Sequence, residues 1–197
     1  MTPTLSRMPL DLGAPADRIV ALAGAVRDDQ LSLPTPCGDQ DVATVLAHII
    51  GFSLGFRDGA AKVSGPTTST PPGPMALPDD WREQLPVRVG ELVTAWRDPA
   101  AWEGETTVGG ATFPAAIHGA FANNELVIHG WDLAVATGQP YDVADVNLKA
   151  SWELVTGVPE DPEARAGLFG PRQPVADDAP LLDRTLAYAG RDPSWTA

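Results

Sequence analysis

Glu125 and His129 lie four residues apart in a segment whose apolar residues predict a helix. That spacing puts a carboxylate and an imidazole on one helix face, with their Cβ atoms roughly 5–6 Å apart. Both groups are metal ligands, and the third ligand we predict is His48, in the amphipathic stretch of residues 42–51. Two histidines and one glutamate form a three-ligand site with open coordination positions, as in catalytic metal centres.

Each of these residues also has a simpler interpretation. Glu125 and His129 could form an intrahelical polar pair worth about 0.3 kcal/mol, and His48 could be a hydrogen-bonded core histidine. However, the residues around Glu125 and His129 are apolar on nearly all sides. Burying a glutamate is unfavourable unless it is paired or bound to a cation, which favours the metal site. Asp132 could orient the His129 imidazole or pair with an arginine.

His118 and Cys37 are weaker candidates for metal ligation. On a continuous helix His118 lies ~10 Å before Glu125 and ~16 Å before His129, too far to share one ion. We therefore predict a structural or pocket-lining role for His118. Cys37 is expected at a helix N-terminus, where a thiol pKa is lowered. It precedes His48 by ~16 Å along a helix, so we expect a small buried apolar residue rather than a ligand.

Composition excludes several classes of partner. The 197 residues carry a net charge of −13, which disfavours binding to nucleic acid or to an anionic membrane. The chain has 1 cysteine, so it forms no internal disulfide, and we expect a cytoplasmic protein. The first twelve residues have no long apolar run, so neither a signal peptide nor a membrane span is expected there.

The periodicity of the apolar residues predicts an all-α fold, an antiparallel four-helix bundle with long loops and a short C-terminal extension. Residues 1–158 would form the bundle, and residues 159–197 an irregular tail with a short helix packed on the same domain. We expect loops at 63–78 and 159–180 and an extended connection at 102–114. The predicted helices cover residues 15–28, 41–60, 80–96, 114–136, 142–156 and 181–189.

Two groups of residues resemble a known family: the first is Thr35, Pro36, Cys37, Val42, Leu46, His48 and Gly51, and the second is His129 to Gln139. The first group is similar to a signature of the DinB-like superfamily, and more closely to the metal-binding N-terminal domain of mycothiol-dependent maleylpyruvate isomerase. The second group, with the tail from residue 169 to 193, resembles an actinobacterial branch of it. Gln40 stands where the family usually has tryptophan, so the entry to that helix should pack differently.

The resemblance implies a DinB-like bundle whose core holds a divalent metal. The family's ligands, one histidine and an E-x-x-x-H pair, fall on His48, Glu125 and His129. It also implies a low-molecular-weight thiol cosubstrate such as mycothiol and a small electrophilic substrate. We therefore expect a metal-dependent thiol transferase or isomerase, acting as a monomer or homodimer.

Zinc is the metal we expect, with nickel or iron as alternatives, because two histidines and a carboxylate also form the facial triad of iron oxygenases. Coordination would deprotonate the thiol at neutral pH. Two other functions remain open. A metal-activated water would make the protein a hydrolase, and a site without chemistry would make it a metal- or ligand-binding module.

Overall fold

The computed structural model describes residues 9–70, 73 and 75–196. Residues 1–8, which belong to the first twelve residues discussed above, and residues 71, 72 and 74 of the predicted loop at 63–78 lie outside the described part. Within the described part of the chain, no helix is both long and apolar enough to cross a membrane. The helices are α1 (Gly13–Gly24), α2 (Val42–Ala60), α3 (Pro66–Ser69), α4 (Trp81–Trp96), α5 (Ala115–Ala136), α6 (Asp145–Gly157), α7 (Pro162–Arg165) and α8 (Leu181–Tyr188).

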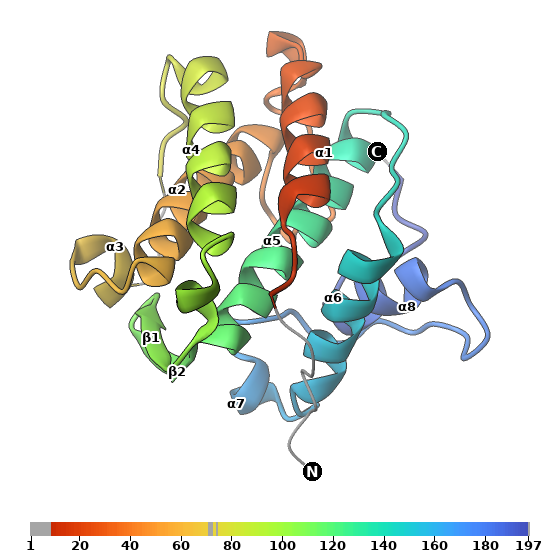
Figure 1. Ribbon diagram of the computed structural model, residues 1–197. Helices are drawn as coiled ribbons and strands as arrows, with labels where there is room; N and C mark the ends of the chain where they lie inside the picture. The colour runs from red at the N-terminus through yellow and green to blue at the C-terminus, as the bar shows by residue number, and fades with distance from the viewer. Residues whose placement is uncertain (1–8, 71–72, 74, 197) are drawn as a thin grey trace.

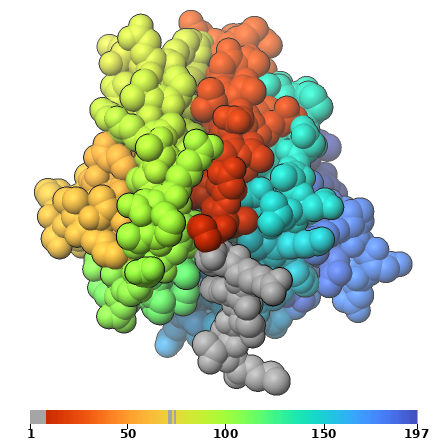
Figure 2. All heavy atoms as spheres, in the orientation of Figure 1, coloured from red at the N-terminus to blue at the C-terminus, as the bar shows by residue number. Residues whose placement is uncertain are grey.

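Helix α5 is the central element of the fold. It contacts α1 and α2 on one side and α6 on another, and α6 in turn contacts α8 (Figure 1). The largest apolar cluster joins α5 to α1, α2 and α4, and a second cluster joins it to α6 and α8. Figure 2 shows α1 on one face of the molecule, between α4 and α6. Because α5 is enclosed in this way, polar groups on it must find partners inside the protein.

The ends of α2 and α5 follow from their local sequences. Asp41 caps α2, since its side chain accepts a hydrogen bond from the Thr44 amide at 2.8 Å. Helix α5 begins directly after Pro114 and ends at Ala136. Gly138 follows with a φ of +68°, a left-handed conformation that favours glycine and stops a helix. The predicted boundaries of these two helices are therefore confirmed.

The mostly helical expectation is confirmed, but the structure adds a β-hairpin. Strands β1 (Glu105–Val108) and β2 (Ala111–Pro114) pair antiparallel, with Val108 opposite Ala111. Gly109 and Gly110 have φ values of +62° and +81°, as a two-residue hairpin turn requires. We predicted only an extended connection here, because four-residue strands are too short to show a clear alternating pattern. The segment at 63–78 likewise contains α3, and that at 159–180 contains α7.

The C-terminal segment packs against the rest of the chain. Leu186 and Ala189, from α8 and its end, are buried in the same cluster as Val127 and Trp131 of α5. The Arg165 guanidinium in α7 donates hydrogen bonds to the carbonyls of Gly170 and Tyr188. These contacts place the turn at residues 190–192 next to α5, which matters for the site described below.

Candidate metal centre

The structure brings His48, Glu125 and His129 together. His48 Nε2 from α2 lies 3.1 Å from Glu125 Oε2 of α5, and His129 Nε2 lies 3.2 Å from the same oxygen. The two imidazole centroids are 4.8 Å apart. One ligand atom from each residue lies within 4.8 Å of the others. The helical spacing in α5 and the packing of α2 against it produce this convergence.

The charges at this site stabilise one another. Burial opposes the ionisation of Glu125, but hydrogen bonds from His129 and His48 outweigh it and hold the pKa of its carboxyl well below the usual range. Burial likewise disfavours a charged His129, whereas its contacts with Asp132 and Glu125 raise the pKa of this imidazole to about 9. Without a bound cation, the His129 imidazole is therefore protonated on both nitrogens at neutral pH, and a metal would displace the proton on Nε2.

Asp132 fixes the orientation of the His129 ring. His129 Nδ1 donates to Asp132 Oδ2 at 3.0 Å, so Nε2 points toward Glu125. The Asp132 side chain is fully buried and also accepts hydrogen bonds from Arg191 Nε at 3.0 Å and from a terminal nitrogen at 2.9 Å. Both partners that we considered for Asp132 are thus present together. A carboxylate bound to the second nitrogen of a ligating histidine is a common feature of metal sites.

Arg191 reaches Asp132 because of a close turn in the C-terminal segment. Gly190 has a φ of +86°, and a Cβ there would lie 2.7 Å from the Gly170 Cα, so only glycine fits. No role was predicted for Arg191 from the sequence. Its position inside the matching Gly190–Pro193 stretch of the tail was the available signal.

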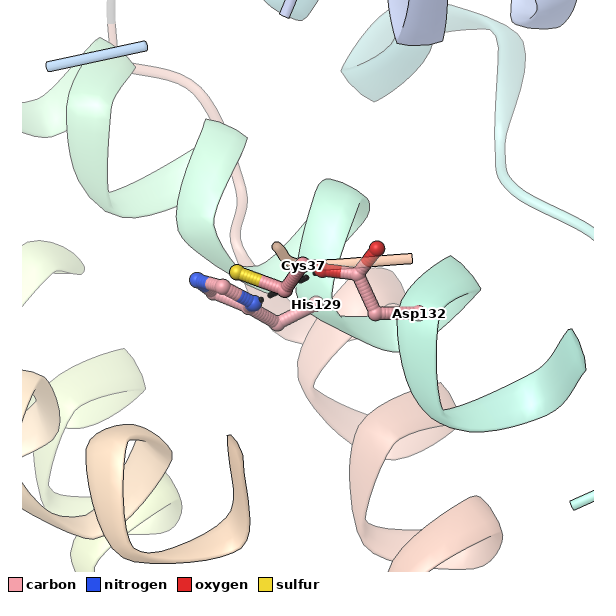
Figure 3. A group of neighbouring side chains, drawn as sticks. All are labelled: Cys37, His129 and Asp132. Atoms are coloured by element: carbon pink, nitrogen blue, oxygen red, sulfur yellow. Dashed lines mark hydrogen bonds and ion pairs between the residues drawn. The ribbon is translucent and has the colours of Figure 1, made fainter. Parts of the chain in front are cut away.

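Our expectation for Cys37 is partly wrong. Residues 37–41 are not helical, and the chain turns so that Pro34 pairs with Asp41. Cys37 therefore lies beside His129 and Asp132 rather than ~16 Å along α2 (Figure 3). Arg191 donates a hydrogen bond to Cys37 Sγ at 3.0 Å. Burial raises the pKa of the Cys37 thiol to about 11, the opposite of activation by a helix N-terminus.

A cavity of about 380 Å³ opens over His48 and Glu125. The phenylalanine rings of residues 52, 56, 113 and 121 line its walls together with His118. His118 is buried, and its Nε2 lies 3.1 Å from the Ala111 carbonyl oxygen in the hairpin. The structure therefore gives His118 both of the roles that we predicted, a structural contact and a place in the pocket.

Two groups of donors could hold a metal in the described part of the chain, and they share His129. The second group is Cys37, His129 and Asp132. Its carboxylate already binds the Arg191 guanidinium, and a second cation there would be repelled by that charge. The first group has two imidazoles and one carboxylate, and no arginine or lysine of the described residues pairs with that carboxylate. Its donor set fits a divalent transition metal.

The fold and this site define a helical protein with a candidate metal centre at the base of a cavity. The family model of the mycothiol maleylpyruvate isomerase N-terminal domain matches residues 12–134. The chain belongs to this family. The match includes His48, Glu125 and His129 but ends before Arg191.

Curated relatives and solved structures agree with this assignment. The chain is 31% identical over 196 residues to uncharacterized proteins from two strains of Mycobacterium tuberculosis, with 89% of this chain and 92% of each relative covered. Crystal structures of the mycothiol-dependent maleylpyruvate isomerase and of a mutant of it match with TM-scores of 0.57 and 0.59 at 19% identity. Each match covers 74% of this chain and 66% of the isomerase, slightly less than two thirds. At this identity the likeness shows the fold.

Proposed function

We propose that this protein binds a divalent metal through His48, Glu125 and His129 and uses a low-molecular-weight thiol to transform a small electrophilic molecule. The observation that carries the proposal is the convergence of three ligand atoms beside a cavity large enough for a small molecule. The reaction would be a thiol-dependent transfer or isomerisation. Zinc is the proposed metal, because two histidines and a glutamate are ligands that zinc takes in catalytic sites. Mycothiol is the proposed thiol, because the family model and the matching solved structures are of a mycothiol-dependent isomerase.

Each residue of the site has a stated task in this proposal. A divalent metal bound there would supply a positive charge that lowers the pKa of a coordinated thiol. His48 and His129 would ligate through Nε2, and Glu125 through its carboxylate. Asp132 keeps Nδ1 of His129 protonated, which leaves Nε2 for the metal. Arg191 holds Asp132 in place.

We extend the proposal to the architecture. Helices α1, α2, α4 and α5 share one apolar core, which supports a DinB-like four-helix bundle. The contacts of α8 with α6 support a C-terminal extension from residue 159 that packs on the same domain. A cytoplasmic location and a monomer or homodimer complete the proposal.

Cobalt substitution tests the use of a thiol. Protein loaded with one equivalent of cobalt should show a sulfur-to-cobalt charge-transfer band when mycothiol is added. The band should be absent in His48→Ala and retained in Cys37→Ser, since Cys37 belongs to the other donor group. Binding of the thiol should tighten as the pH rises, because the ligand is the thiolate.

Three results would count against this function. If cobalt loads stoichiometrically but mycothiol, glutathione and cysteine all leave the spectrum without a sulfur band, the metal site stands and the thiol role fails. Loss of the band in Cys37→Ser would move the metal to the second donor group. Failure of the wild-type protein to bind cobalt or zinc would remove the whole proposal.

A further inference from the structure

Four phenylalanine rings line the cavity over His48 and Glu125. His118 has the rings of Phe56, Phe113 and Phe121 around it, with centroid distances of 6.4, 5.5 and 6.5 Å. Phe52 lies at the other end, 5.5 Å from the His48 ring. Such walls favour a flat apolar group, because stacked or edge-on aromatic contacts add to the benefit of removing apolar surface from water.

The charged side chains around the cavity do not favour a bound anion. Among the described residues, neither a lysine nor an arginine lines it. Glu125 places a carboxylate at its base, and burial lowers the pKa of His118, so that this imidazole stays neutral at pH 7. Arg57, on α2, is engaged by Asp58 and Glu91, and Arg191 by Asp132.

An anionic ligand would therefore enter the cavity at a disadvantage. A desolvated carboxylate needs a compensating charge or several hydrogen bonds, and enzymes commonly meet that need with arginine. A single divalent cation with one glutamate ligand offers a net charge of only +1, which cannot balance two carboxylates. The net charge of −13 adds a long-range repulsion.

We propose that the electrophile bound in this cavity is a neutral molecule with an aromatic or similarly flat apolar group, and not a dicarboxylic acid such as maleylpyruvate. That the ligand is an electrophile rests on the proposed function, but the preference for a neutral ligand follows from the cavity itself. The relatives of this chain in the isomerase family therefore need not share its substrate class.

A matched pair of probes tests the preference. Cinnamamide and cinnamate have nearly the same shape and differ in charge at neutral pH. We expect calorimetry to give at least tenfold tighter binding of cinnamamide at pH 7.5. The measurement is made on zinc-loaded and on chelator-treated protein, because a carboxylate could also ligate zinc directly.

Phe113→Arg provides the gain-of-binding variant. Phe113 lines the cavity from β2 and is 38% exposed, so an arginine there should be tolerated and place a cation at the cavity wall. Cinnamate should then bind at least as tightly as cinnamamide. Val87→Arg is the control, since Val87 on α4 is 55% exposed and does not line the cavity. It should leave the tenfold preference unchanged.

The outcomes separate this inference from the proposed function. Equal or tighter binding of cinnamate by chelator-treated wild-type protein, or no binding of either probe, would overturn the inference even if zinc and mycothiol bind as proposed. An unaltered preference in Phe113→Arg would overturn it as well. If the protein fails to bind zinc but the chelator-treated protein keeps the tenfold preference for cinnamamide, the proposed function fails and the inference that the cavity prefers a neutral ligand stands.

Discussion

The two sides of the His129 ring have different surroundings. On the Nε2 side lie Glu125 and His48, whose side chains are 24% and 31% exposed and line the cavity. On the Nδ1 side lie Asp132, which is fully buried, and Arg191, which is 12% exposed. We call these the open side and the closed side. Both contain a carboxylate within hydrogen-bond distance of an imidazole nitrogen, but the Asp132 carboxylate is fully buried, whereas Glu125 lines the cavity.

This difference indicates that the two sides of the ring have different roles. On the closed side every charge has a protein partner, so its role is to hold the ring in one orientation. On the open side the Glu125 carboxylate has, among the residues that the structure describes, only the two imidazoles as partners, and all three groups can change partner when a cation arrives. The buried Arg191–Asp132 pair beside His129 costs desolvation, which is consistent with a role in positioning the imidazole rather than in stability alone.

The largest expected effect is on metal binding through the open side. Glu125→Gln removes a charged ligand and should weaken zinc affinity by more than about 100-fold, beyond the loss typical of a residue that only supports a ligand. Chelator competition measures this affinity. Glu91→Gln is the matched control, because Glu91 on α4 also lies between two basic side chains, Arg57 and Arg88, but is outside the site. If the two variants bind zinc equally well, the open side is not the metal centre.

A smaller effect on metal binding, with a larger one on stability, is expected from the closed side. Arg191→Met leaves Asp132 without its buried partner and should lower the free energy of unfolding by about 3–5 kcal/mol. Zinc affinity should fall about 10–100-fold as His129 loses its fixed orientation. Denaturant melts and chelator competition give the two values. Arg97→Met serves as the comparison, since Arg97 is 63% exposed and should contribute less than about 1 kcal/mol. If Arg191→Met changes neither the free energy of unfolding nor the zinc affinity, the closed side contributes to neither stability nor metal binding.

The pH dependence of metal affinity and that of the stability of the metal-free protein should both reflect the charges on the two sides of His129. Because the pKa of His129 is raised to about 9, the metal must displace its proton at lower pH, and affinity should rise about tenfold per pH unit from 7 to 9. In chelator-treated protein the same proton stabilises the fold, fully below pH 6.5, and this contribution is lost as the pH rises through 9. Thus the melting temperature of the metal-free protein should fall over the range in which metal affinity rises. Opposite or flat trends in these two titrations would contradict the charge arrangement. Asp132→Asn removes a charge that raises the pKa of His129, so in this variant the metal affinity should stop rising at a lower pH.

The site could be predicted only in part from the sequence. Glu125 and His129 share a helix, so their spacing alone puts them on one face. Their meeting with His48 depended on two helices packing together, which the apolar patterns and the family resemblance suggested. Cys37 was misplaced because its distance was measured along a helix that begins only at Val42.

The sequence by itself determined the properties that depend on local spacing and composition. These are the helices around the site, the cap at Asp41, the stop at Gly138 and the acidic charge. Only the tertiary structure decided which partners surround His129. Arg191 lies 59 residues from Asp132 and 154 from Cys37 along the chain, and its contact with both requires the Gly170–Gly190 approach. The hairpin and the phenylalanine walls likewise become a cavity only when distant segments pack, because no local pattern encodes a space between elements.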